Sequence, residues 1–348
     1  MAVTPTRFLA AGSDDTALAL KVYSGVFNEA WRNQPKLYTA EQPVIHKRSA
    51  AGSKSYQFLK FAETPNADES YRPGGDLAGQ AFAVDEGTNS VDDGYVIAHH
   101  RLPRDHTVVS HFEVWAQLAR ADARQVGMVL DRRLFTTACL AARAPATTKN
   151  GLTVDSGGNR VTRSGGSVAA AYPRSATGAA NFRADLRQLA RLMDEDNVPP
   201  ETRWLWYTPY MNEVLLYDNT AQVFSRDYAT NGNDISTRTV RVIEGFKVVD
   251  ERVNTRTNGG SFPDSNIVTG PARYQGDFSI GASTGTPVAL ALCQGPDGGA
   301  AVTMGNWEDV QNIVHYDPET LSWFMASFVL GGISQMNPYC AGSVEVII

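Results

Sequence analysis

Cysteine is scarce in this chain of 348 residues. Cys139, Cys293 and Cys340 are an odd number without any C-x-x-C spacing. A disulfide framework needs paired cysteines and a structural zinc site needs clustered ligands, so the sequence excludes both. Cys139 lies within a helical pattern, where we expect a small buried hydrophobic residue. We expect all three thiols to be reduced, as is typical of a protein made in a cytoplasm.

Long apolar runs and basic blocks are also missing. No apolar run reaches the roughly 18 residues of a membrane-spanning helix, and the N-terminus lacks the apolar core of a signal peptide. We therefore expect a soluble protein. The formal net charge is −6, with Lys and Arg scattered among Asp and Glu. This argues against sequence-specific DNA binding, although an acidic surface can enclose DNA without adhering to it.

Recognisable enzyme motifs are nearly absent. There is no P-loop, no G-x-G-x-x-G and no H-E-x-x-H. Gly281-Ala-Ser283-Thr-Gly285 matches the nucleophile elbow of hydrolases, which requires a strand before it and a helix after it. The residues that follow, TPVALALC, have the pattern of a strand. We interpret the motif as a turn and expect no enzyme and no cofactor or metal site; a hydrolase that uses Ser283 is the enzymatic alternative.

Four of the six histidines crowd into one short segment: His99, His100, His106 and His111. His99 and His100 are adjacent, so in a strand they point to opposite faces and cannot converge on a metal. We interpret this segment as a structural hinge between an arm and a helix. The alternative is a pH-responsive contact between subunits.

The pattern that is most informative is a long amphipathic helix. Apolar residues recur with a 3.6-residue period from Val108 to about Arg143, and Pro145 ends the pattern. A helix of roughly 35 residues is about 50 Å long. We expect its charged residues, among them Asp122 and Asp131, to occupy the solvent-facing surface.

An extended excursion, residues 46–103, precedes this helix. We expect a strand from Lys54 to Ala62, a turn-rich tract around Pro73-Gly74-Gly75, and a return strand from Gly94 to His99. A loop of this length is uncommon inside a compact domain. The sequence therefore predicts a β-arm that lies on a neighbouring molecule.

The remaining chain alternates helices and strands. We expect a helix from Thr16 to Ala30, another around Phe182–Met193, and a strand over Arg203–Thr208 that leads into a helix. Thr208 would cap that helix and Pro209 would take its first position. A strand broken at Gly245, a β segment from Phe278 to Cys293, and a helix or strand followed by a closing strand complete the pattern.

Together these segments resemble the major capsid protein of tailed bacteriophages, which has the Hong Kong 97-like fold, in the short-tailed podovirus branch related to coliphage T-seven. Leu18–Trp31 resembles the N-terminal arm, Arg48–Glu63 the first limb of the extended loop, and Asn197–Leu216 a passage of the axial domain. The end of the chain, from FMASFVLGG at Phe324–Gly332 to the last VEV strand, is the most specific part.

The resemblance implies an α+β fold of five parts. These are an N-terminal arm (1–45), an extended β-hairpin loop or E-loop (46–105), a peripheral domain with the long spine helix (106–178), an axial domain (179–300), and a return to the peripheral domain (301–348). The arm and the extended loop would reach over neighbouring subunits.

The function implied is self-assembly, as hexamers and pentamers, into a T=7 icosahedral shell around the double-stranded DNA genome. The protein would be made in the host bacterial cytoplasm and end in the virion capsid. A separate scaffolding protein, a portal protein at one vertex and a decoration or cement protein would be its partners. An encapsulin-like nanocompartment shell of the same fold is the alternative.

The founding phage of that fold joins its subunits through a lysine–asparagine bond. Lysines occur in the extended loop here, but we expect a non-covalent shell. The charged and aromatic residues that we select as candidates for contact between subunits are Lys54, Lys60, Glu63, Glu69, Tyr71, Arg72, Arg124, Arg132 and Arg133.

Overall fold

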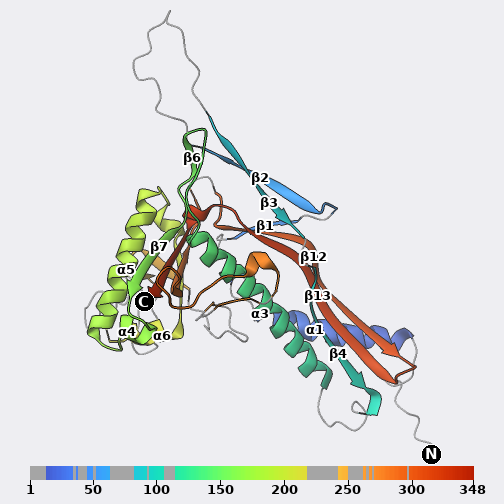
Figure 1. The fold of residues 1–348 in the computed structure, drawn as a ribbon. Coiled ribbons are helices and arrows are strands. Elements are labelled where there is room, and N and C mark those ends of the chain that lie inside the picture. Colours follow the sequence, from blue (N-terminus) through green and yellow to red (C-terminus); the bar gives the residue numbers. More distant parts are fainter. Residues whose placement is uncertain are drawn as a thin grey trace, which may run out of the picture.

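The structure is a computed structural model. It describes residues 13–33, 37, 45–49, 52–62, 82–91, 94–105, 114–217, 242–249, 262–263, 266–268, 270–295 and 298–348. Two sheets lie at opposite ends of one long helix, and a two-stranded hairpin extends from the region between them (Figure 1).

The first sheet has four strands in the order β1-β12-β13-β4. The strands are β1 (Ile45–Ser49), β12 (Val302–Asp317), β13 (Ser322–Gln335) and β4 (Val96–Pro103). β1 runs parallel to β12, whereas β12, β13 and β4 pair antiparallel. β12 and β13 form a long hairpin, which gives this half of the molecule its elongated shape (Figure 1).

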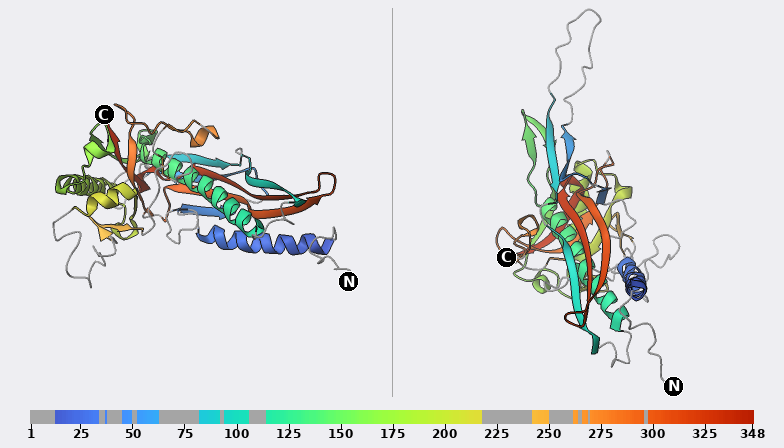
Figure 2. Two further views of the ribbon diagram at one scale, coloured as in Figure 1. Left: turned by 90° about the horizontal axis from the view of Figure 1, so that it is seen from below. Right: turned by 90° about the vertical axis from the view of Figure 1, so that its right-hand side faces the viewer.

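Helices α3 (Val114–Ala142) and α1 (Ser13–Asn33) cover one face of this sheet, lying side by side (Figure 2). Tyr23, Phe27 and Trp31 of α1 are buried against α3 and the sheet. They recur every four residues, so they form one apolar stripe on α1. The stripe closes the first hydrophobic core.

The second sheet has six strands in the order β7-β14-β11-β8-β10-β9. Their bounds are β7 (Asn159–Ser164), β14 (Ala341–Ile347), β11 (Thr286–Leu292), β8 (Trp204–Tyr207), β10 (Phe246–Val248) and β9 (Val242–Ile243). Every residue of β11 is buried, as expected of a central strand that is covered on both faces.

Helices and short elements complete this half. They are the helices α4 (Val168–Ala171), α5 (Ala176–Glu195) and α6 (Pro209–Leu215), the hairpin strands β5 (Thr147–Lys149) and β6 (Leu152–Asp155), and the 3₁₀ turns η2 (Pro200–Thr202), η3 (Ala272–Tyr274) and η4 (Pro338–Cys340). The Thr208 side chain accepts a hydrogen bond from the Met211 amide, and Pro209 begins α6. The predicted helix start is confirmed.

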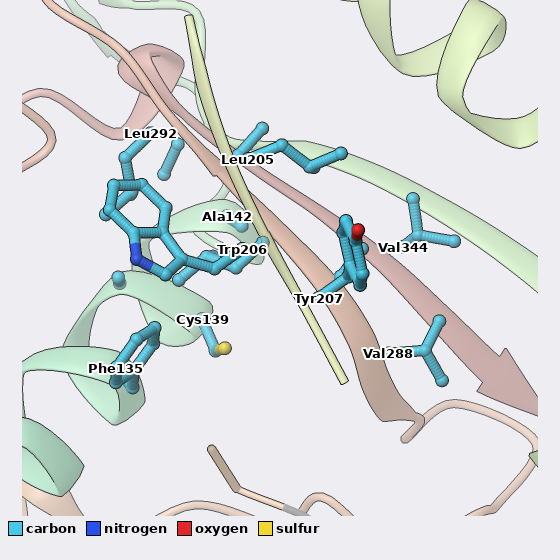
Figure 3. Packing of buried hydrophobic residues seen from close by; sticks show 14 of the residues in the cluster. Phe135, Cys139, Ala142, Leu205, Trp206, Tyr207, Val288, Leu292 and Val344 are labelled. Carbon is cyan, nitrogen blue, oxygen red and sulfur yellow. The ribbon is translucent and has the colours of Figure 1, made fainter. Parts of the chain in front are cut away.

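The second core forms where the C-terminal half of α3 meets the six-stranded sheet (Figure 3). Trp206 of β8 is fully buried, and its ring packs edge to face on Phe135 of α3 with 6.4 Å between ring centroids. Cys139 is buried in the same cluster. All three cysteines are free, and burial raises the pKa of each thiol, that of Cys340 to about 12.

The remaining strands are β2 (Ser55–Phe61) and β3 (Val84–Ser90), which pair antiparallel along their whole length. They form a hairpin that leans away from the two sheets beside β6 (Figure 1). The predicted strand over Lys54–Ala62 is confirmed. The turn-rich tract at 73–75 lies outside the described residues.

Several expectations need correction. Asp122 and Asp131 are 0% and 1% exposed, so their predicted solvent-facing position is wrong. The reason is that α1 covers Asp122 and that Leu37 lies against Asp131, with its amide donating to Asp131 Oδ1. α3 begins at Val114 among the described residues, and 106–113 lie outside them.

His99 and His100 point to opposite faces as predicted, and neither lies in a hinge, because both are inside β4, which is paired with β13 throughout. His106 and His111, the other two residues of the predicted hinge, lie outside the described residues. Phe278–Gly285 is not a strand; only Thr286–Leu292 is. β12 was not predicted at all. The segment over Phe324–Gly332, left open between helix and strand, belongs to β13.

The sheets combine segments that belong to different expected domains. β7 and β14, which the sequence interpretation placed with the peripheral domain, pair with each other in parallel within the six-stranded sheet. β1 and β4, placed in the extended loop, are strands of the four-stranded sheet. Helix α1, expected to reach over a neighbour, packs on the α3 of its own chain.

Replacing Trp206 with alanine should destabilise the fold by about 3–5 kcal/mol, because the cavity left at the centre of the second core cannot collapse. Urea unfolding of the full chain measures this. Trp206→Phe should cost clearly less, since it keeps the ring contact and removes an indole N–H that has no hydrogen-bond partner in the described part of the chain. Equal stability of Trp206→Ala and the wild type would contradict the assignment of this core.

Candidate interaction surfaces

The base of the β2–β3 hairpin is fixed to the four-stranded sheet. Asn89 is fully buried, and its Nδ2 donates to the Tyr56 hydroxyl at 3.1 Å and to the Gly332 carbonyl at 3.0 Å. The Tyr56 hydroxyl is in turn hydrogen-bonded to the Thr303 hydroxyl. These bonds satisfy the buried Asn89 amide nitrogen and the Tyr56 hydroxyl, and they set the direction in which the hairpin leaves the body.

The far end of the hairpin carries exposed apolar side chains. Leu59 and Phe61 of β2 are 57% and 67% exposed, and Phe82, just before β3, is 72% exposed. Leu59 and Phe61 are two residues apart, so they share one face of the strand. Large apolar side chains gathered on a projecting element are typical of an interaction surface.

Two reciprocal ion pairs hold the hairpin against the β5–β6 hairpin. Lys60 Nζ of β2 lies 2.8 Å from Asp155 Oδ2 of β6, and Lys149 Nζ of β5 lies 2.5 Å from Asp85 Oδ1 of β3. The hydrogen bond from Lys149 lowers the pKa of Asp85. Each hairpin thus contributes one cation and one anion, and this arrangement opposes both sliding and lifting of the β2–β3 hairpin.

A second apolar surface lies on the face of the four-stranded sheet opposite α1 and α3. Ile97 and Ile313 are 51% and 46% exposed there, and Phe324 and Phe328 are partly exposed between them. Cross-strand register places these side chains on the same face. Tyr95 packs edge to face on Phe328, with ring centroids 5.3 Å apart. No element among the described residues covers this outer face.

A buried carboxylate joins the end of α3 to the six-stranded sheet. Glu345 of β14 is fully buried, and its two oxygens accept from Arg143 Nε and Arg160 Nε, each at 2.8 Å. Arg143 also donates to the carbonyls of Asp277 and Gly285, at 2.7 and 2.5 Å. Helix, sheet and the preceding loop are therefore connected at one point.

A second buried carboxylate joins α1, α3 and β4. The Tyr23 hydroxyl donates to Asp122 Oδ2, and His100 Nε2 lies 2.6 Å from Asp122 Oδ1. The latter two atoms lie in contact, but they do not form a hydrogen bond with each other. Burial, followed by the hydrogen bond to Asp122, raises the pKa of Tyr23.

The G-x-S-x-G match is a turn, as predicted. Ser283 lies in an exposed loop, and the strand β11 begins three residues later, where a nucleophile elbow needs a helix. The Ser283 carbonyl accepts from Arg160 Nη1 at 3.2 Å, so the loop is part of the contacts around Glu345. Among the described residues no group of three or more His, Cys, Asp or Glu side chains could hold a metal ion.

The predicted contact residues occupy different environments. Lys54 is exposed at the base of the hairpin and Arg124 is exposed on α3, whereas Lys60 is engaged by Asp155. Arg132 and Arg133 are partly buried beside η3. The other four, Glu63, Glu69, Tyr71 and Arg72, lie outside the described residues.

Sequence reasoning missed Leu59, Phe61 and Phe82, the exposed apolar residues at the far end of the β2–β3 hairpin, as candidates. The signal was present in the alternation of β2, in which Tyr56 and Phe58 face the body and Leu59 and Phe61 do not.

In the part of the chain that the structure describes, no helix is long and apolar enough to cross a membrane.

No protein-family model matches the chain, and a search of the curated proteins returns no relative. Solved structures do match. The capsid of the cyanophage P-SCSP1u is similar with a TM-score of 0.69 at 20% identity, covering 87% of this chain and 86% of that one. The mature capsid of bacteriophage PhiM1 gives a TM-score of 0.68 at 14% identity, with the same coverage. The chain has the Hong Kong 97-like phage capsid fold.

This capsid fold confirms the α+β fold class expected from the sequence. Its similarity extends beyond the first two structures: the Mycobacterium phage Che8 structure matches with a TM-score of 0.54 at 11% identity, over 85% of each chain. Coverage of this extent is far larger than either sheet or the long helix alone. The likeness therefore concerns the whole architecture and not one substructure.

Reversing the charge in Lys149→Glu should loosen the hairpin, because it places two carboxylates together. An exposed ion pair contributes only about 0.2–1 kcal/mol, so we expect amides of β3 to exchange with solvent a few-fold faster. The double variant Lys149→Glu/Asp85→Lys should restore the wild-type rate. Hydrogen exchange measures both, and failure of the double variant to restore protection would show that the pair does not hold the hairpin.

Removing the charge in Glu345→Gln should destabilise the fold by about 3–5 kcal/mol, because it leaves two guanidinium groups beside a buried neutral side chain. Urea unfolding tests this, with the exposed Glu319→Gln as a control that should stay within about 0.5 kcal/mol of the wild type. Similar unfolding midpoints for the two variants would overturn the assigned role of Glu345.

Proposed function

We propose that this chain is a major capsid protein that assembles into a closed icosahedral shell around phage double-stranded DNA. The observation that carries the proposal is the capsid fold over 87% of the chain, shared with the P-SCSP1u and PhiM1 capsid structures. We assign it to the short-tailed podovirus branch, with hexamers and pentamers on a T=7 lattice, virion localisation and a structural role without enzymatic activity.

Two apolar surfaces on one chain support self-assembly. The hairpin tip around Leu59 and Phe61 and the outer sheet face around Ile97 and Ile313 are both left exposed. We propose that the tip of one subunit packs on the outer face of the next. Such a head-to-tail contact closes into rings when the rotation between copies is right. Each contact needs only moderate strength, since a shell sums many of them.

The sheets support a revised division into domains. We propose that the four-stranded sheet with α1 and the first half of α3 forms the peripheral domain. The six-stranded sheet with α5 and α6 would form the axial domain. The extended loop then reduces to the segment that includes β2 and β3, which in the sequence connects β1 and β4, the two edge strands of the four-stranded sheet.

Among the polar candidates, Lys54 and Arg124 are exposed and remain our proposed contact residues. Glu63, Glu69, Tyr71 and Arg72 remain proposed from their positions in the sequence of the extended loop. Lys60 and Arg133 make contacts within their own chain, and Arg132 is partly buried beside η3. We propose that these three residues position the surfaces and do not form the first contacts between copies. A scaffolding protein during assembly, a portal protein and a cement protein are the further partners that we propose.

Replacing Leu59 and Phe61 together by serine should leave the subunit folded but reduce closed shells at least tenfold, because the tip can no longer bury apolar surface on a neighbour. Co-expression with the neighbouring phage genes, followed by sedimentation and electron microscopy, measures the yield. Gln57→Ser is the matched control, since Gln57 lies exposed on the same face of β2.

Normal particles from the double variant would refute the proposed role of the tip. Deleting residues 54–90 should abolish shells altogether, and particles formed by the deletion variant would contradict the role of the whole loop. The content of wild-type particles decides between a phage capsid and a nanocompartment: packaged DNA supports the proposal, whereas an enclosed enzyme would overturn it.

A further inference from the structure

A small cavity lies between α3 and the segment that contains η3. Its volume is about 40 Å³, and its lining includes Val129, Arg132, Arg133 and Thr136 of α3 together with Ile267 and Tyr274. The four helical residues are spaced i, i+3, i+4 and i+7, so they share one face of α3. The cavity is separate from both apolar surfaces described above.

The charged side chains that line this cavity are positive among the described residues. Two arginines line it, and no carboxylate does so among the described residues. The Arg133 guanidinium lies over the Tyr274 ring, 5.0 Å from its centroid, and Arg273 lies over the same ring at 5.2 Å. The Tyr274 hydroxyl accepts a hydrogen bond from the Ile333 amide at 3.0 Å. Tyr274 is therefore fixed, and it holds Arg133 in place at the edge of the cavity.

A buried hydroxyl completes the lining. Thr136 is 1% exposed, and its Oγ1 has no hydrogen-bond partner among the described residues. By contrast, the next residue, Thr137, donates to the Arg133 carbonyl at 2.8 Å in the way usual for a helical threonine. A buried hydroxyl without a partner is costly, and such groups call for a ligand or water.

We propose that this cavity binds a phosphate group, with Thr136 as a hydroxyl donor and Arg132 and Arg133 as charged donors. A water needs only about 10–15 Å³ of such volume, so the cavity accommodates a small oxyanion but no nucleoside. Guanidinium groups match oxyanions through paired N–H donors. Because the Thr136 hydroxyl is buried, a phosphate group must enter the cavity completely to reach it. Free phosphate or a terminal phosphate monoester can do so, whereas a phosphodiester carries a substituent on each side.

Thermal unfolding of the full chain, with inorganic phosphate titrated against chloride at equal ionic strength, tests this site. We expect phosphate to raise the midpoint in a saturable way and chloride not to do so, since a ligand that binds only the native state stabilises it. Thr136→Val should abolish the phosphate response. Without phosphate this variant should be at least as stable as the wild type, because it removes an unpartnered hydroxyl.

Arg132→Gln should weaken the apparent phosphate affinity about tenfold or more, since hydrogen bonds to charged groups are strong ones. Arg120→Gln, at an exposed position of the same helix, is the control and should respond like the wild type. An equal effect of phosphate and chloride, or a full phosphate response in Thr136→Val, would overturn the site and leave water as its occupant. Short oligonucleotides that differ only in a 5′-phosphate or 5′-hydroxyl identify the source, and an equal response to both would overturn the preference for a terminal phosphate.

Discussion

The structure depends on one helix that is buried in two separate cores. The first half of α3 packs through Ala119, Ala123 and Val126 against α1 and the four-stranded sheet. Its second half packs through Phe135, Ala138 and Cys139 against the six-stranded sheet. An α-helix is stiff over such a length, about 44 Å for 29 residues. The two sheets are therefore held at a defined separation, which is a requirement for any subunit that must fit a lattice.

Buried carboxylates strengthen this arrangement at both ends of the helix. Asp122 joins α3 to α1 and β4, and Glu345 joins the C-terminal end of α3 to β14 through Arg143. Removing a donor from such a contact is costly, because the carboxylate that remains is fully buried and cannot reach water. These contacts thus favour the observed placement of the helix and the sheets over alternative placements that would pack their apolar side chains similarly well. A chain built in this way presents its hairpin and its outer sheet face at fixed positions relative to each other.

The sequence predicted the features that depend on local patterns, and it did not predict those that depend on contacts between distant residues. The long helix, the strand β2 and the start of α6 rest on local patterns, namely apolar periodicity and capping by Thr208 before Pro209, and each was confirmed. Asp122 and Asp131 were misplaced because a charged residue in an amphipathic pattern normally faces water. Their burial depends on Tyr23, some hundred residues earlier in the chain, and on the segment at Leu37. The long strand β12 was missed for a related reason: its first half is buried and its second half alternates, so neither pattern extends over its full length.

The sequence alone determined the elements with strong local periodicity, the absence of a disulfide framework and, through the resemblance of its segments, the α+β capsid fold. Only the tertiary structure decided which strands share a sheet, including the pairing of β14 with β7. Only the tertiary structure decided that α1 packs on α3 of the same chain. Only the tertiary structure, too, brought Thr136 and Arg133 beside Tyr274. The reason is that pairing and burial depend on contacts between residues far apart in the chain, whereas periodicity and capping act within one or two turns.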